Sequence, residues 1–174
     1  MLNIGIIGAG RIGKVHLESI SYHVKNAAVK AVADPFMNDE TRAFIESFGV
    51  TDIYTDYKKI LEDKEIDAVL VCSSTDTHAA ISIEAIKAGK HVFCEKPVDH
   101  SVEKIKAVAD TLAANPGVKA VVGSGSSSIL HRKTFNFAAE NISKAYNVPI
   151  LAKLDGVGTD EDIVRIKAEL EKLS

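Results

Sequence analysis

Short apolar runs alternate along the first 123 residues with segments whose apolar positions recur at helical spacing. Continuous runs are typical of strands buried on both faces, and they predict strands at 4–7, 28–33, 52–54, 67–72, 91–95 and 118–123. The helical segments between them lie at 11–23, 39–48, 56–63, 77–89 and 101–114. This alternation predicts parallel pairing through right-handed crossovers. The expected fold class is α/β, a doubly wound parallel sheet in a three-layer α/β/α arrangement.

Residues 124–174 continue with one more helix, strand and helix. The helix is expected at 129–146, the strand at 148–154, and the last helix after the capping pattern Thr159-x-x-Asp162. As a helix-strand-helix extension packing on the same sheet, they would give a single domain of six or seven strands. Two alternatives stay open: a segment joined from another α/β protein by recombination or design, and the start of a truncated second domain.

The first strand runs into a glycine-rich turn, Gly8-Ala9-Gly10-Arg11-Ile12-Gly13. In a pyrophosphate site of this pattern, Gly8 permits the turn, Gly10 lets the phosphate approach, and Gly13 lets the helix pack close to the strand. The backbone N–H groups of Arg11 and Ile12, at the start of the helix, would hold the anion. Taken alone the pattern is weak, because any strand-to-helix turn can be rich in glycine.

The second strand ends at Asp34, about where the ribose-binding acid follows such a turn. An aspartate there accepts hydrogen bonds from both hydroxyls of the adenosine ribose and repels a 2′-phosphate, so Asp34 favours NAD over NADP. The ordinary alternative is a strand end ahead of Pro35. The full order of strand, glycines, helix, strand and acid predicts a Rossmann-like nucleotide-binding domain at 1–123, with a nicotinamide dinucleotide as partner and NAD as cofactor.

Further candidates lie in the loops at 73–78 and 95–100, because ligands bind at the carboxyl ends of the strands where the sheet order reverses. We expect contacts to the cofactor from Ser73, Ser74, His78 and Glu95. We expect Lys96 to be catalytic, orienting a substrate hydroxyl or stabilising charge that develops on its oxygen. The alternatives are turn serines, a histidine that begins a helix, and a lysine that reaches into solvent.

Three stretches resemble the nucleotide-binding half of the glucose-fructose oxidoreductase and inositol dehydrogenase family. They are the turn at 8–13, Thr77-His78, and Ala88-Gly89-Lys90-His91-Val92-Phe93-Cys94-Glu95-Lys96-Pro97. The resemblance covers 1–123 and implies an NAD-binding domain of a sugar or polyol dehydrogenase. It also implies that Lys96 lies near the nicotinamide and the substrate, and that a cis bond often precedes Pro97.

The resemblance stops after residue 123. Full-length members of this family are much longer and add an antiparallel-sheet substrate domain, in which an Asp and a His stand four residues apart on a helix. No Asp-x-x-x-His follows residue 123 in this chain. We therefore expect the chain alone to be weakly active or inactive on a polyol or sugar. The alternative is a non-catalytic nucleotide-binding module or a chimeric α/β scaffold.

Composition narrows the function classes further. The chain is 46% hydrophobic and 26% charged, with a net charge of −3, as in an ordinary soluble protein. It has no basic stripe for nucleic acid, and no apolar run near the roughly 20 residues that cross a bilayer. The start of the first strand leaves no room for a signal peptide. Cys72 and Cys94 lack metal-ligand spacing, so we expect no metal and two inert thiols in the cytoplasm. An oligomer stays open.

Overall fold

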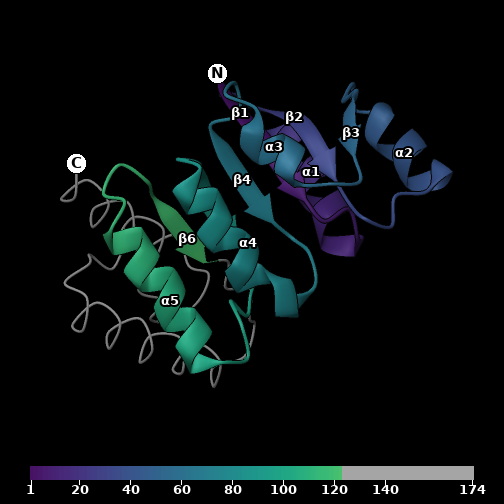
Figure 1. Ribbon diagram of the computed structural model, residues 1–174. Coiled ribbons are helices and arrows are strands. Elements are labelled where there is room, and N and C mark those ends of the chain that lie inside the picture. Colours follow the sequence, from purple (N-terminus) through teal and green to yellow (C-terminus); the bar gives the residue numbers. More distant parts are fainter. Residues whose placement is uncertain (123–174) are drawn as a thin grey trace, which may run out of the picture. The chain divides into compact units, whose positions relative to one another are not determined.

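The computed structural model describes residues 1–122, which form a six-stranded parallel sheet flanked by helices (Figure 1). In chain order the elements are β1 (Leu2–Ile7), α1 (Arg11–His23), β2 (Ala27–Ala33), α2 (Asp39–Glu46), β3 (Asp52–Tyr54), α3 (Lys58–Glu62), β4 (Ala68–Val71), α4 (Thr75–Lys87), β5 (His91–Cys94), α5 (Val102–Ala113) and β6 (Ala120–Val122). The strand order is β3-β2-β1-β4-β5-β6, and every neighbouring pair is parallel. The predicted doubly wound fold is confirmed.

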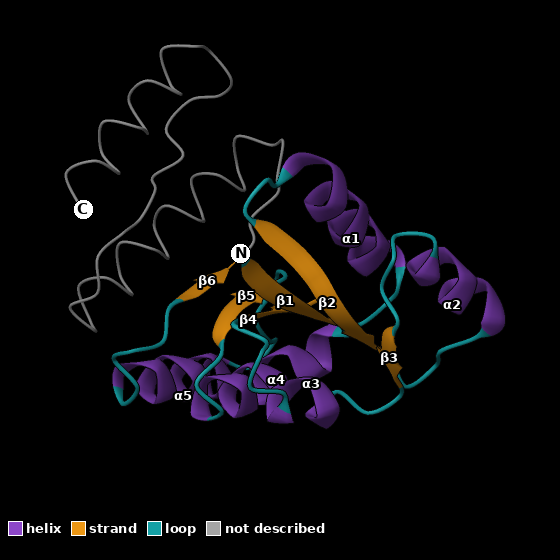
Figure 2. Cartoon of the chain, turned by 90° about the horizontal axis from the view of Figure 1, so that it is seen from above, coloured by secondary structure: helices purple, strands orange, loops and turns teal. Residues whose placement is uncertain are grey.

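Helices cover both faces of this sheet, with α1 and α2 on one side and α3, α4 and α5 on the other (Figure 2). Strand side chains divide between the two faces and build a separate core cluster on each. The α1/α2 side buries Ile4, Ile6, Val32, Leu70 and Cys72 against Leu17, Ile20 and Ile45. The other side buries Ile7, Ala31, Ala33, Val69, Val71, Val92 and Cys94 against Ile60, Ile81, Ala85 and Ile86. Each large aliphatic side chain stabilises the fold by about 1.5–3 kcal/mol.

Predicted and observed elements agree in type over 1–122, and their ends differ by a few residues. The largest consequence is at α4, which begins at Thr75 after the N-cap Ser74 rather than at 77. Asp76 lies in the first turn, where a negative charge favours the helix dipole. His78, expected at the second position of this helix, is therefore at its fourth. The elements predicted for 129–174, including the seventh strand, fall outside the described residues.

The β1–β2 pairing contains a bulge at Lys30. Ile4 pairs with Val29, whereas the next residue, Gly5, pairs with Ala31. The extra residue shifts the alternation of side chains along β2, because a bulge places two residues opposite one. Val29 packs with the α1/α2 cluster, while Ala31 packs with the opposite one. The bulge therefore sets the facing of every later residue of β2.

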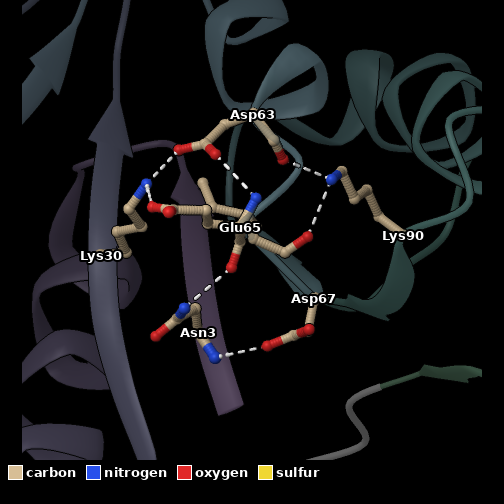
Figure 3. Close-up of polar contacts among 7 residues, drawn as sticks. Asn3, Lys30, Asp63, Glu65, Asp67 and Lys90 are labelled. Carbon is tan, nitrogen blue, oxygen red and sulfur yellow. Dashed lines mark hydrogen bonds and ion pairs between the residues drawn. The ribbon is translucent and has the colours of Figure 1, made fainter. Parts of the chain in front are cut away.

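Lys30, the extra residue of this bulge, forms ion pairs near the amino-terminal edge of the sheet (Figure 3). Lys30 Nζ bonds to Asp63 Oδ2 and lies 2.8 Å from Glu65 Oε2. These hydrogen bonds raise the pKa of Lys30 and lower the pKa of Asp63. The buried Lys90 donates to the carbonyl oxygens of Asp63 and Ile66, the latter at 2.8 Å. The network joins β2 and the residues after α3 at the edge opposite the carboxyl ends.

Candidate functional site

The order of the strands brings the loops after β2, β1, β4 and β5 together at one edge of the sheet. Sheet order reverses between β1 and β4, since the chain moves outward in one direction from β1 and in the other from β4. This is the crevice in which doubly wound sheets bind their ligands. The predicted site residues come from these four loops or from the first turns of the helices that follow them, Arg11 and Ile12 from α1 and His78 from α4.

Three glycines shape the turn after β1. Gly8 has a φ of +102°, and a Cβ there would lie 2.5 Å from the carbonyl carbon of Cys72. A Cβ on Gly13 would lie 2.0 Å from the carbonyl oxygen of Gly8, so α1 packs directly on the turn. Gly10 is different, because a Cβ there would meet no atom of residues 1–122 within 4 Å. Two glycines serve the fold, and the third leaves open space over the turn.

The start of α1 offers backbone donors to that space. Gly10 is the N-cap and has no side chain with which to bond the helix, and no acidic residue lies in the first turn. The N–H groups of Arg11 and Ile12 precede the first intrahelical hydrogen bonds, as at every helix start. An anion at this point would receive both donors and the favourable end of the helix dipole.

Asp34 reaches the same turn from the end of β2. Its Oδ2 accepts a hydrogen bond of 2.6 Å from the N–H of Ala9, and its Oδ1 accepts one of 2.8 Å from the N–H of Phe36. Each carboxylate oxygen has a second lone pair, so the group can accept from hydroxyls as well. The open turn, the helix donors that have no partner within the described residues, and this half-buried carboxylate are suited to the diphosphate and the adenosine ribose of a dinucleotide.

Two serines follow β4. Ser73 Oγ lies 2.7 Å from Thr77 Oγ1, which also donates to the carbonyl oxygen of Ser74 at 2.7 Å. These bonds fold the loop back on the first turn of α4. Ser74 is exposed at the edge of the site, whereas Ser73 is half-buried.

Glu95 follows β5 and is held from two sides. Its N–H donates to the carbonyl oxygen of Val71 at 2.9 Å, which continues the β4–β5 pairing. Its Oε1 lies 2.7 Å from Nε2 of His16, and its Oε2 accepts from the N–H of Lys96 at 3.2 Å. His16, on α1, was not predicted for the site. No local pattern could reveal it, because it meets Glu95 only through the fold.

His78 is 2% exposed and bonds to backbone on both sides of its ring. Nδ1 lies 2.8 Å from the carbonyl oxygen of Pro97, and Nε2 lies 2.9 Å from that of Ser73. Contact with the Cys94 side chain, together with the Pro97 and Ser73 carbonyls, raises the pKa of His78 to about 9 against the opposing effect of burial. Both ring nitrogens are therefore occupied by protein atoms.

Lys96 is exposed directly after Glu95, and the bond between Lys96 and Pro97 is cis, as the resemblance implied. Within residues 1–122, no hydrogen bond or ion pair holds its ammonium group. The charge is thus available to a ligand at the carboxyl edge of the sheet.

Neither cysteine is placed to react at the site. Cys72 and Cys94 are free and buried, and burial raises the pKa of the Cys72 thiol to about 12. In the described part of the chain, no three His, Cys, Asp or Glu side chains converge to hold a metal ion. Over the same residues, no helix has the length and apolar character needed to cross a bilayer.

Comparison with known proteins agrees with this geometry. A family model described as "Oxidoreductase family, NAD-binding Rossmann fold" matches residues 2–124. A myo-inositol 2-dehydrogenase of Thermotoga maritima is 43% identical over 112 residues, which cover 60% of this chain and 33% of that protein. This chain thus spans about a third of that relative's length.

Solved structures show the same likeness. A probable dehydrogenase from Thermotoga maritima has a TM-score of 0.66 at 34% identity, covering 84% of this chain and 41% of that one. The scyllo-inositol dehydrogenase of Lactobacillus casei, solved with bound NAD(H) and scyllo-inositol, has a TM-score of 0.67 at 26% identity. That match covers 84% of this chain and 41% of the other. The Rossmann fold and bound NAD(H) are thus both found among similar proteins.

Proposed function

Because the chain belongs to the oxidoreductase family whose NAD-binding Rossmann fold matches residues 2–124, we propose that it is the nucleotide-binding part of a dehydrogenase for inositols or related polyols and sugars. In this proposal NAD(H) lies across the loops after β1, β2, β4 and β5. Residues 1–123 form the dinucleotide-binding domain and 124–174 an extension of it. The inositol class rests on the similar proteins, two of which are named for inositols.

The observation that carries the proposal is the open space at Gly10. It lies next to the start of α1, whose first N–H groups have no partner among residues 1–122, and next to Asp34, which accepts a 2.6 Å hydrogen bond from Ala9. The N–H groups of Arg11 and Ile12 would bind the diphosphate, which needs a close approach that any side chain at Gly10 would block. Asp34 would accept from the ribose hydroxyls. A 2′-phosphate would instead meet its negative charge, so the site should prefer NAD to NADP.

The remaining candidates would serve the nicotinamide half. When bound, NAD accepts a hydride from the carbon of a secondary alcohol. Ser73, Ser74 and Glu95 would contact the nicotinamide ribose or ring, and the Lys96 ammonium would hold the substrate oxygen and stabilise negative charge on it. A positioned base for the hydroxyl proton adds about 10²–10⁴-fold to such a reaction, and no Asp-x-x-x-His follows residue 123 to supply one. We therefore propose that the 174 residues alone turn over slowly or not at all.

Calorimetric titration of the chain with NAD, NADH and NADP tests the binding site. We expect NAD and NADH to bind and NADP to bind more weakly. Asp34→Ala should weaken NAD binding by about tenfold or more, because it removes a charged acceptor of two ribose hydroxyls. Asp110→Ala, an exposed carboxylate on α5, is the matched control and should leave the affinity unchanged. Absence of NAD and NADH binding would contradict the proposal.

A turnover assay separates an active dehydrogenase from a binding module. With NAD bound, production of NADH from a panel of inositols and sugars should stay near background. If turnover is measurable, Lys96→Ala should abolish it while NAD still binds. Rapid turnover that survives Lys96→Ala would contradict both the low activity and the role of Lys96. Binding without any turnover favours the alternative, a non-catalytic nucleotide-binding module.

A further inference from the structure

His78 joins two loops of the candidate site through backbone atoms alone. The carbonyl oxygen of Ser73 lies in the loop between β4 and α4, and that of Pro97 in the loop between β5 and α5. The ring lies between these two carbonyl oxygens. Its backbone is held in place, because His78 belongs to the start of α4 and its neighbour Ala79 is buried, with 1% of its surface exposed. The two loops carry Ser73 and Ser74 on one side and Lys96 on the other.

The chemistry of the ring follows from its two partners. A carbonyl oxygen only accepts hydrogen bonds, and a neutral imidazole has a single N–H. Either neutral tautomer would therefore set a ring lone pair against one of the two carbonyl oxygens. Only the imidazolium donates to both at 2.8 and 2.9 Å. Cys94, on β5, is the titratable side chain that contacts the ring. Within residues 1–122, no carboxylate forms an ion pair with it.

We propose that His78 is a positioning residue, which as an imidazolium holds the backbone of Ser73 and of Pro97 at a fixed separation and thereby sets where Lys96 lies relative to the β4–α4 loop. The inference deepens the proposed function and rests on it, because it assigns the geometry of the nicotinamide half to one buried side chain. The adenosine half depends on the glycine turn and Asp34, which do not contact His78.

The protonation state is tested directly on the full chain without nucleotide. Histidine labelled with ¹⁵N should show two slowly exchanging ring N–H signals at pH 7.5 for one of the six histidines. Both signals should vanish in His78→Gln and remain in His23→Gln, a control at the exposed end of α1. A single ring N–H signal for His78, the mark of a neutral tautomer, would overturn the proposal.

The positioning role is tested by comparing two ligands. NADH can be followed by its own fluorescence because the chain has no tryptophan, and ADP probes the turn and Asp34 alone. Glutamine has one donor nitrogen, and its other terminal atom is an oxygen that only accepts, so His78→Gln cannot donate from two ends as the imidazolium does. NADH affinity should therefore fall about three- to tenfold. ADP affinity should not change, and His23→Gln should alter neither. Equal loss for both ligands, or no loss for either, would show that His78 does not position the nicotinamide half.

Failure of the proposed function is distinguishable from failure of this inference. A wild-type chain that binds neither NADH nor ADP contradicts the NAD site itself, whatever the state of His78. If His78→Gln does not fold, the ring signals of the wild-type chain still decide whether both carbonyls receive an N–H. The proposal requires both results: two ring N–H signals for His78, and a loss of NADH affinity in His78→Gln without a loss of ADP affinity.

Discussion

Single atoms decide the roles of the three glycines after β1. A Cβ on Gly13 would lie 2.0 Å from a backbone oxygen, whereas one on Gly10 would enter open space. The same change, addition of a side chain, should therefore damage the fold at one position and only the ligand site at the other. The pattern Gly-x-Gly-x-x-Gly cannot make this distinction, since it records the residues and not what surrounds them.

Gly10→Asn and Gly13→Ala test this difference. Asparagine is a favoured N-cap, so Gly10→Asn should leave the free energy of unfolding unchanged or slightly higher. It should still abolish NAD binding, because the new side chain fills the open space and takes up N–H groups of α1. Gly13→Ala should lower the free energy of unfolding by about 1–3 kcal/mol through overpacking. Urea unfolding and calorimetric titration measure the two effects, and loss of stability in Gly10→Asn would contradict the assignment.

At the scale of elements, the bulge in β2 connects the two ends of the sheet. The alternation of side chains between the two faces of the sheet shifts by one residue at Lys30. Without this extra residue, the side chains from Ala31 to Asp34 would point to the opposite faces. With this alternation, the side chain of Asp34 points toward the glycine turn and accepts a hydrogen bond from the N–H of Ala9. The register that orients this carboxylate at the carboxyl edge thus begins at Lys30, whose side chain forms ion pairs at the amino edge.

Lys30→Ala should lower the urea midpoint more than Lys59→Ala. Within residues 1–122, Lys59 forms only an exposed i,i+3 pair with Glu62 at 3.3 Å, whereas Lys30 binds both Asp63 and Glu65. The pKa of Asp63 is lowered in the folded chain, so its contribution is present above the unfolded pKa of about 3.9 and is lost as the pH falls through the folded value. The difference between wild type and Lys30→Ala should thus persist at neutral pH and disappear in acid. A difference that persists unchanged in acid would rule out the ion pair as its cause.

Sequence patterns predicted the elements well and their polar connections poorly. The strands of the centre are continuous apolar runs, and α1 begins after Gly10 and ends at His23 as expected. The sequence does not predict the bulge, because residues 27–33 are alanine and valine apart from Lys30. No alternation of polar and apolar residues therefore marks where the side chains change faces. The His16–Glu95 contact joins residues far apart in the chain. Such contacts depend on tertiary packing and have no local signature.

At the scale of the whole molecule, buried groups with raised pKa values make stability depend on alkaline pH. His78 has a folded pKa of about 9, above its unfolded value of about 6.5. A raised folded pKa gives stability that is complete below the unfolded value and lost as the pH rises through the folded one. The thiol of Cys72, with a folded pKa of about 12, adds a similar loss only above its unfolded value of about 8.5.

The midpoint of thermal unfolding should accordingly fall as the pH rises from 6 to 8.5, and the deprotonation of His78 should cause this fall. We expect His78→Gln to remove this dependence and His23→Gln to retain it. The sign matters, because a neutral buried histidine would make the chain more stable as the pH rises. A midpoint that rises over this interval, with the His78→Gln variant flat, would contradict the imidazolium.

The hydrogen bond between Asp34 and the Ala9 N–H has a kinetic consequence. Because this bond is formed without a ligand, we expect the proposed nucleotide site after β1 to need no rearrangement of the loop, so that capture should require only diffusion and the release of hydration water. Association should then proceed in one phase whose rate is proportional to nucleotide concentration. Differences in affinity among nucleotides should lie in how long each one stays bound.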